Sequence, residues 1–195
     1  YDISNTAGSE NVAGMIVFKD GKPYKAAYKK FKIKSFIGQD DYRSMAEVLD
    51  RRFTEYNNGT EGFDTLPDLI LLDGGKTHVG AVKQVLFEMK IDIPVFGMVK
   101  DEHHKTRTIV TDEEEISIAK EQSVFVFVYK LQEEVHRFAI EYHRSLHNRN
   151  SIGSVLDNVK GIGPVKRNAL LAHFDSIEDI KKATLEELME VEGIT

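Results

Sequence analysis

Cysteine is absent from the 195-residue sequence, so neither a disulfide framework nor a cysteine-ligated metal site is available. The absence favours a reducing compartment, and we expect a cytoplasmic location. No apolar run reaches the length of about 20 residues that crosses a membrane, and no signal peptide is visible. An excess of positive charge is also lacking, because the formal net charge is −6. Any contact with nucleic acid must therefore come from local basic groups or backbone donors.

The length suits one domain of ordinary size followed by a small one. A change of composition near Arg149 leads us to predict domains at residues 1–149 and 150–195. The chain opens at Tyr1 with an apparent strand and ends at Thr195 inside a motif, so we expect a fragment of a longer protein whose second domain is incomplete.

Three short strands at residues 1–4, 12–18 and 24–33 are predicted at the start of the chain. Short turns separate them, including the turn signal Asp-Gly-Lys-Pro at 20–23. Sequential strands joined in this way predict an antiparallel meander. The third strand alternates weakly and carries many lysines, which is typical of an edge strand.

The following elements alternate between helix and buried strand. A helix begins near Asp40 and Asp41, which suit a cap, and apolar strands are predicted at 69–73 and 93–99 with a helix between them. Because helical crossovers join parallel strands, both strands should run parallel to the first. A small hairpin within 106–118 and a long amphipathic helix at 122–148 come next, although residues 123–128 also fit a strand.

Asp73 ends the buried run of the fourth strand and is followed by Gly74 and Gly75. Open α/β sheets place their chemistry at such strand ends, although a plain strand–turn–helix joint with a solvated aspartate fits as well. Asp2 lies on the first strand, which is commonly the parallel neighbour of the next strand. Two adjacent carboxylates would bind Mg²⁺ or Mn²⁺; alternatively, Asp2 lies at an exposed strand end.

Histidines recur along one side of the long helix, at His136, His143 and His147. Either the row is a basic stripe that faces solvent, or one of its histidines faces the sheet. That histidine would complete the metal site as a ligand or would move a proton. His103 and His104 are expected in a surface loop.

Two glycine turns mark the last part of the chain as a weak repeat, at residues 159–162 and 191–194. After the first turn, Pro164 suits the start of a helix, whose free N–H groups are a phosphate site. A plain αα-hairpin is the alternative. The second turn, with Gly193, has Glu192 and lacks lysine, so it is a poorer phosphate site. The residues predicted to contact a DNA backbone are Lys160, Gly161, Ile162, Gly163, Lys166, Arg167 and Gly193.

Five segments in order resemble the C-terminal half of the UvrC family, the nuclease subunit of bacterial nucleotide excision repair. They are Tyr-Asp-Ile-Ser-Asn-Thr at 1–6, Gly-Gln-Asp-Asp-Tyr at 38–42, Leu-Pro-Asp-Leu-Ile-Leu-Leu-Asp-Gly-Gly-Lys at 66–76, His-Arg-Phe-Ala-Ile at 136–140 and Gly-Ile-Gly-Pro at 161–164. Each alone is weak, whereas the ordered set is specific and covers essentially the whole chain.

The resemblance implies an α/β, ribonuclease H-like mixed sheet flanked by helices, followed by a small all-α tandem helix-hairpin-helix domain. It implies a metal-dependent endonuclease that cuts on the 5′ side of a DNA lesion. The catalytic residues of the family match Asp2, Asp73 and His136, and a further aspartate matches Asp41, which we expect to act in positioning. The implied partners are damaged double-stranded DNA and UvrB, which binds a region outside this chain, with UvrA upstream.

Two other functions stay open from the sequence. One is a non-catalytic DNA-binding module of a repair complex, in which the first domain is a scaffold. The other is a flavodoxin-like domain that binds a nucleotide at Gly74 and Gly75. The antiparallel start and the absence of a longer glycine fingerprint weaken this second alternative.

Overall fold

The structure is a computed structural model that describes residues 1–4, 11–35, 40–100, 106–156, 158–174 and 176–194. The chain divides into two compact units, Tyr1–His143 and Arg144–Thr195, and each is considered by itself. No helix among the described residues combines the length and apolarity that a membrane span requires.

Nine strands are described in the first unit. Their bounds are β1 (Asp2–Ser4), β2 (Val12–Met15), β3 (Phe18–Lys19), β4 (Lys22–Pro23), β5 (Lys29–Lys32), β6 (Ile70–Asp73), β7 (Val95–Lys100), β8 (Thr106–Val110) and β9 (Glu115–Ser117). The predicted meander is confirmed, since β1, β2 and β5 pair antiparallel in that order. β6 and β7 pair parallel, and β8 and β9 extend that group antiparallel.

The predicted strands at 12–18 and 24–33 are too long. Asp20 and Gly21 both have positive φ, and this turn pairs β3 with β4 in a separate two-stranded hairpin. A 3₁₀ turn, η1 (Lys25–Ala27), then interrupts the third predicted strand. The chain therefore leaves the main sheet between β2 and β5.

Two backbone hydrogen bonds join the two strand groups. The Tyr1 nitrogen donates to Leu71 O at 2.8 Å, and Asp73 N–H donates to Tyr1 O at 2.8 Å. This is the parallel pattern, with Tyr1 opposite Leu72 and Asp2 opposite Asp73. The strands therefore form one mixed sheet in the order β5-β2-β1-β6-β7-β8-β9, as predicted for the first and fourth strands.

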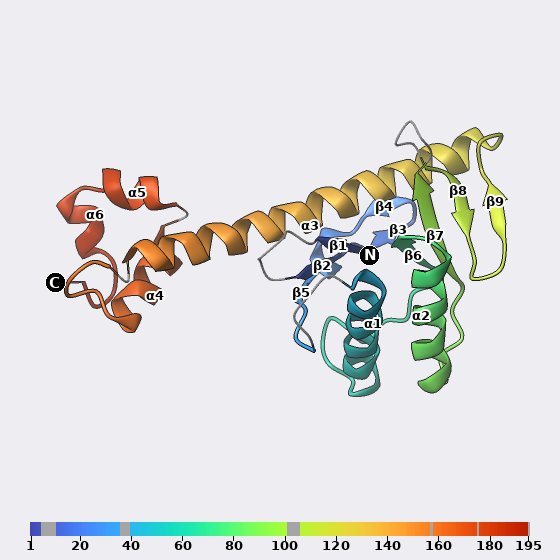
Figure 1. The fold of residues 1–195 in the computed structure, drawn as a ribbon, viewed down its shortest axis with the longest axis horizontal. Helices are drawn as coiled ribbons and strands as arrows, with labels where there is room; N and C mark the ends of the chain where they lie inside the picture. The colour runs from blue at the N-terminus through green and yellow to red at the C-terminus, as the bar shows by residue number, and fades with distance from the viewer. Residues whose placement is uncertain (5–10, 36–39, 101–105, 157, 175, 195) are drawn as a thin grey trace. The chain divides into compact units, whose positions relative to one another are not determined.

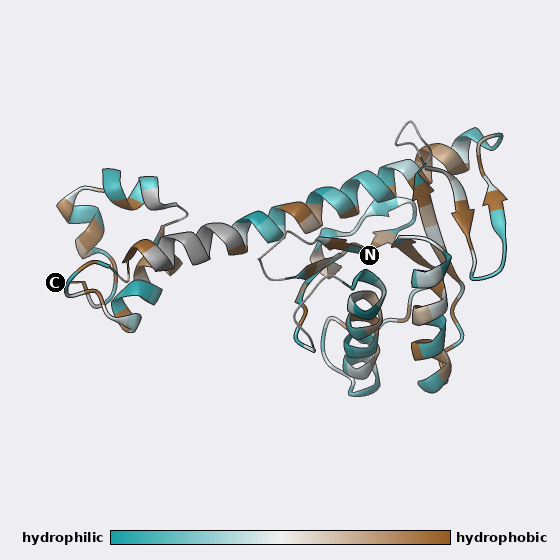
Figure 2. Ribbon diagram, viewed as in Figure 1, coloured by the Kyte–Doolittle hydropathy of each residue, from teal (hydrophilic) through white to brown (hydrophobic). Residues whose placement is uncertain are grey.

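Helices cover both faces of this sheet. α1 (Asp41–Asn57) and α2 (Lys76–Glu88) lie on one face, and the first part of α3 (Gln122–Leu156) crosses the other (Figure 1). The first face has a core that includes Phe53, Val82 and Leu72, whereas Val128 and Val135 pack with Met98 on the α3 face. Figure 2 shows the apolar colour on β6 and β7 and the hydrophilic colour along much of α1.

α3 extends beyond its predicted end at residue 148 and finishes at Leu156. Residues 123–128 are helical, so the strand alternative for them is wrong. The predicted domain boundary between residues 149 and 150 falls inside this helix and stays a prediction. One glycine, Gly153, does not end the helix, because a single glycine costs a helix only about 1 kcal/mol.

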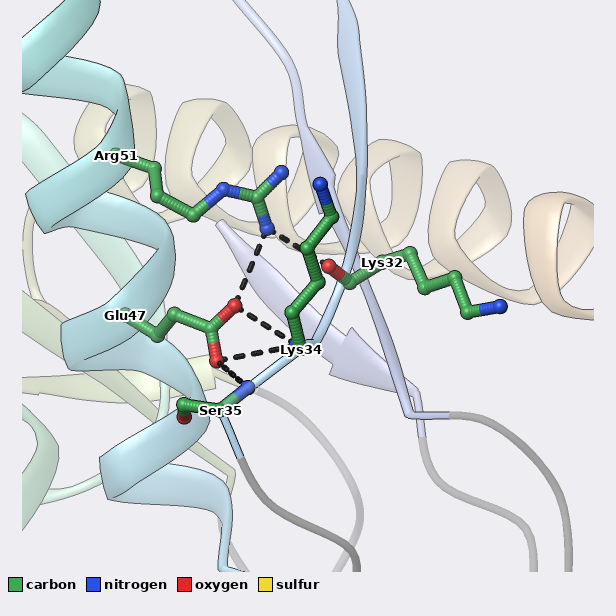
Figure 3. A network of polar contacts seen from close by, with 5 residues as sticks. All are labelled: Lys32, Lys34, Ser35, Glu47 and Arg51. Carbon is green, nitrogen blue, oxygen red and sulfur yellow. Dashed lines mark hydrogen bonds and ion pairs between the residues drawn. The ribbon is translucent and has the colours of Figure 1, made fainter.

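A polar network fastens the end of β5 to α1 (Figure 3). Glu47 accepts hydrogen bonds from the backbone N–H groups of Lys34 and Ser35 at 2.9 and 3.0 Å. Arg51 pairs with Glu47 at 3.2 Å and donates to Lys32 O at 2.7 Å. The backbone at the end of this edge strand is thus fixed by side chains of a helix.

The second unit is helical and has an internal repeat. α4 (Pro164–His173), α5 (Ile177–Lys182) and α6 (Leu185–Met189) enclose a small core of Leu156, Leu170 and Val191. The two glycine turns match, because Ile162 N–H donates to Val159 O and Ile194 N–H donates to Val191 O. Both isoleucines pack on the core.

Candidate metal centre

Strand alternation brings Asp2 and Asp73 to the same face of the sheet. Tyr1, Ile3 and Leu72 pack into the core on the α1 and α2 side. Because successive side chains of a strand point to opposite faces, Asp2 and Asp73, which adjoin these residues, face α3. Because β1 and β6 are parallel neighbours with Asp2 opposite Asp73, the two side chains lie next to each other. The predicted adjacency is confirmed.

His136 reaches the pair from α3. Its Nδ1 lies 2.9 Å from Asp2 Oδ2, and one ligand atom from each of the three side chains lies within 4.8 Å of the others. Asp2 and Asp73 are 8% and 15% exposed, whereas His136 is 48% exposed. The two carboxylates of the cluster are therefore largely buried, and the His136 imidazole is accessible to solvent.

Ionisation of both Asp2 and Asp73 is unfavourable without a cation beside them. Burial raises the pKa of Asp2, and the neighbouring charge of Asp73 raises it further, while the hydrogen bond from His136 opposes this rise. Two carboxylates this close and this buried repel each other, so the arrangement favours a bound cation.

Two residues that the sequence did not indicate hold Asp73. Gln132, which is 1% exposed, donates from Nε2 to Asp73 Oδ1 at 2.6 Å and lies 3.4 Å from Met98 O. Both neighbours are acceptors, which assigns the amide nitrogen to this side. Lys100 at the end of β7 lies 3.4 Å from Asp73 Oδ2. In the sequence, Gln132 could have been found as a polar residue one helical turn before His136, on the same face of the long helix.

The turn after Asp73 is closely packed. A Cβ at Gly97 on β7 would overlap Gly74 O, and a Cβ at Gly74 would lie 2.6 Å from Cγ of His78 on α2. Gly74 and Gly97 thus permit close approach of other groups of the protein, whereas a Cβ at Gly75 would meet nothing within 4 Å.

Asp41 is not part of the cluster among the described residues. It is exposed and is the first residue of α1, while Asp40 caps that helix by accepting from Arg43 N–H at 3.0 Å. The cap prediction is confirmed for Asp40, and a positioning role for Asp41 stays a prediction. Of the other histidines, His143 is partly buried, and the side chain of His147 and both His103 and His104 lie outside the described part.

The predicted DNA-contact residues lie around the first glycine turn of the second unit. Gly161 has φ +91° and Gly193 has φ +81°, values that favour glycine at both turns. Pro164 is the first residue of α4 and Gly163 precedes it as the N-cap, as predicted. Lys160 is exposed, while Lys166 and Arg167 on α4 are partly exposed.

Comparison with known families matches residues 1–140 to the UvrC RNase H endonuclease domain. Residues 154–195 match the SAM-like helix-hairpin-helix tandem. The chain belongs to the UvrC endonuclease family. It is accordingly a ribonuclease H-like nuclease domain followed by a helix-hairpin-helix region, which confirms the fold class and the resemblance.

Similar full-length proteins carry the name UvrABC system protein C. Identity is 50% over 201 residues with the protein of Lachnospira eligens, 50% over 206 with that of Clostridium acetobutylicum, and 47% over 194 with that of Clostridioides difficile. Each match covers 100% of this chain but only 33%, 33% and 31% of the relative. The chain thus spans about a third of the length of the curated UvrC relatives that it matches.

Proposed function

We propose that this chain is the part of a UvrC protein that makes the 5′ incision at DNA lesions in nucleotide excision repair, in a divalent-metal-dependent reaction. The observation that carries the proposal is the pairing of Asp2 and Asp73 on neighbouring parallel strands beneath His136. The substrate is damaged double-stranded DNA, the partner that recruits the protein is UvrB, and UvrA acts upstream. Because the substrate is the bacterial chromosome, the location is the cytoplasm.

The donor set fits Mg²⁺ or Mn²⁺. Carboxylate oxygens suit both ions, and the imidazole nitrogen extends the set toward Mn²⁺. Asp2, Asp73 and His136 are the residues that would hold the ion, since one ligand atom from each lies within 4.8 Å of the others. When bound, the ion supplies charge stabilisation for the phosphate and makes a water more acidic.

Side chains of the sheet and of α3 would position the cation and the DNA for this reaction. Asp2 and Asp73 would hold the cation, and Gln132 fixes Asp73 through Oδ1, so that Oδ2 is the oxygen left for a ligand or for Lys100. His136 either completes the ligand set or moves a proton. Its exposure gives DNA access to it, and with Nδ1 against Asp2 its other nitrogen is the one that meets the substrate.

The helix-hairpin-helix region would bind the DNA backbone without regard to sequence. The first-turn N–H groups of α4, a ten-residue helix that follows Gly163, are donors suited to a phosphate. Lys160, Lys166 and Arg167 add positive charge beside them. The second turn, at Gly193, carries Glu192 and would bind phosphate less well unless residues further along the protein add charge.

The test compares two aspartates on the same segment in the full-length protein. Asp73→Asn should abolish 5′ incision of lesion DNA with Mg²⁺ or Mn²⁺ while circular dichroism shows the wild-type fold. Asp68→Asn, at an exposed position just before β6, is the matched control and should cut normally. If Asp73→Asn still cuts with the fold intact, the catalytic proposal fails and a non-catalytic DNA-binding role is favoured.

A further inference from the structure

A basic hollow lies beside the candidate metal centre, on the same face of the sheet. It has a volume of about 560 Å³ and lies between η1, β5 and α3. Its lining residues are Lys25, Tyr28, Lys29, Lys30, Arg137, Phe138 and Glu141. A local group of cations stands out in a chain with a net charge of −6.

The acidic groups at the hollow are already engaged. Arg137 binds Glu134 at 2.8 Å and Glu141 at 2.6 Å, and Tyr28 donates to Glu134 at 3.2 Å. The ammonium of Lys29 lies 4.9 Å from the centre of the Phe63 ring, on the other face of the sheet, so Lys25, Lys30 and Arg137 are the cations that count here. Against the two carboxylates they leave an excess of one positive charge. Because Arg137 is paired with both carboxylates, Lys25 and Lys30 make the hollow suited to an anion.

The strand register fixes the direction from the metal centre to the hollow. Asp2 pairs with Gly14, and Gly14 pairs with Lys30, so the three residues form one row across β1, β2 and β5. Cross-strand partners share a face, and the row spans two strand spacings, or about 10 Å. Figure 3 shows the side chain of Lys32 leading away from α1, and Lys30 shares that face of the strand.

Aromatic rings lie under the cation at the end of this row. Lys30 Nζ lies 5.2 Å from the centre of the Phe138 ring and 5.4 Å from that of Tyr142. Phe138 also lies over Gly14, where a Cβ would be 3.1 Å from its ring. The rings fix the position of the ammonium through cation–π contact, and a lysine held in this way is suited to a phosphate of a nucleic acid strand.

We propose that this hollow binds the DNA strand on one side of the scissile phosphodiester, within a few nucleotides of the cut. The short separation follows from the row of about 10 Å between Asp2 and Lys30. Lys25 and Lys30 contact phosphates, and Phe138 and Tyr142 hold the ammonium of Lys30 at the end of the row. The inference rests on the proposed nuclease function, since the position is counted from its metal centre.

The test measures DNA affinity of the full-length protein in Ca²⁺, with the double variant Lys25→Ala/Lys30→Ala. Each lost phosphate contact lowers the slope of log Kd against log salt by about one. The slope should therefore fall by about two, and the affinity advantage of the wild type should shrink about tenfold between 50 and 200 mM salt. Lys19→Ala/Lys22→Ala, in the exposed β3–β4 hairpin, is the charge-matched control and should keep the wild-type slope.

A neutral methylphosphonate in the DNA locates the contact. It is moved one phosphate at a time through the first few nucleotides on each side of the cut. At the contacted phosphate it should weaken the wild type and weaken the double lysine variant no further. Additive losses, or an unchanged slope in the variant, overturn the proposal. An unchanged slope with weakened association of a protein partner would instead assign the hollow to an acidic protein surface. Incision by Asp73→Asn is measured separately and reports on the metal centre, whereas the salt slope of the double lysine variant reports on the hollow, so a failed catalytic proposal is distinguishable from a failed binding site.

Discussion

Gln132 shows how one buried amide determines the geometry of a carboxylate. It is almost fully buried on α3 and uses its nitrogen on Asp73 and Met98 O. Groups that orient metal ligands typically contribute 10- to 100-fold to affinity or activity. We therefore regard Gln132 as a positioning residue for Asp73.

Gln132→Leu should reduce Mn²⁺ affinity and 5′ incision by about 10- to 100-fold, because Asp73 loses the donor that holds it. The unfolding temperature should change little or rise, since leucine suits the apolar neighbours Val128 and Val135. Titration of Mn²⁺ and thermal unfolding measure the two effects. Glu133→Gln, the next and exposed residue, is the control. A variant that unfolds earlier but binds Mn²⁺ normally would show that Gln132 is only structural.

Asp2 carries a stability cost that depends on pH. Its pKa is raised in the folded state by burial and by Asp73, so the folded protein holds this proton more tightly than the unfolded chain. Stability is greatest below the ordinary aspartate pKa and is lost as pH rises through the raised value. Asp2→Asn should remove this loss in EDTA.

The expected result is equal stability of Asp2→Asn and wild type near pH 4, with the variant becoming more stable toward about pH 7. Urea unfolding across this range, with metal chelated, makes the comparison. Saturating Mn²⁺ should reverse the order at neutral pH, because only the wild type gains binding energy. A constant difference at every pH would contradict the assignment of the cost to Asp2.

At the scale of elements, β6 and β7 approach so closely that Gly97 fixes the turn after Asp73. Gly97→Ala should cost about 1–3 kcal/mol of stability and lower 5′ incision, because its methyl group would displace Gly74 O. Gly80→Ala in α2 has open space and should instead stabilise by about 0.5–1 kcal/mol with normal cutting. Chemical unfolding measures the stability, and incision assays measure the cutting. Wild-type stability together with wild-type cutting in Gly97→Ala would refute this packing argument.

The sequence predicted the elements that matter most for the site. The order of a meander followed by helical crossovers was enough to place Asp2 next to Asp73, because the first strand of such a meander is commonly the neighbour of the next parallel strand. Gln132 and Lys100 were missed, since their positions depend on how α3 and β7 pack against β6, which periodicity does not report. The strand limits near Lys25 and the end of α3 were wrong because turn and helix propensities are weak beside tertiary packing.

At the scale of the molecule, we propose that the second unit adds sequence-independent backbone binding to the chemistry of the first. Lys160→Ala/Lys166→Ala should weaken DNA binding of the full-length protein several-fold and leave Mn²⁺ affinity unchanged. Lys181→Ala/Lys182→Ala in α5 removes the same charge from two other exposed positions of this unit and should have little effect. Equal losses from both pairs would indicate bulk charge rather than a site at the glycine turn.

The family model and the relatives account for the architecture of both units, whereas the roles of individual residues rest on geometry. The equivalence of the turns at Gly161 and Gly193 was visible in the sequence as a repeat and is confirmed by their matching hydrogen bonds. Cation binding at the sheet is the central claim on which the catalytic roles depend.

Anomalous diffraction from a Mn²⁺-soaked crystal of the protein tests this claim most directly. The predicted result is a manganese peak with carboxylate oxygens of both Asp2 and Asp73 at about 2.0–2.2 Å. The absence of a manganese peak between Asp2, Asp73 and His136 at saturating Mn²⁺ would contradict the account.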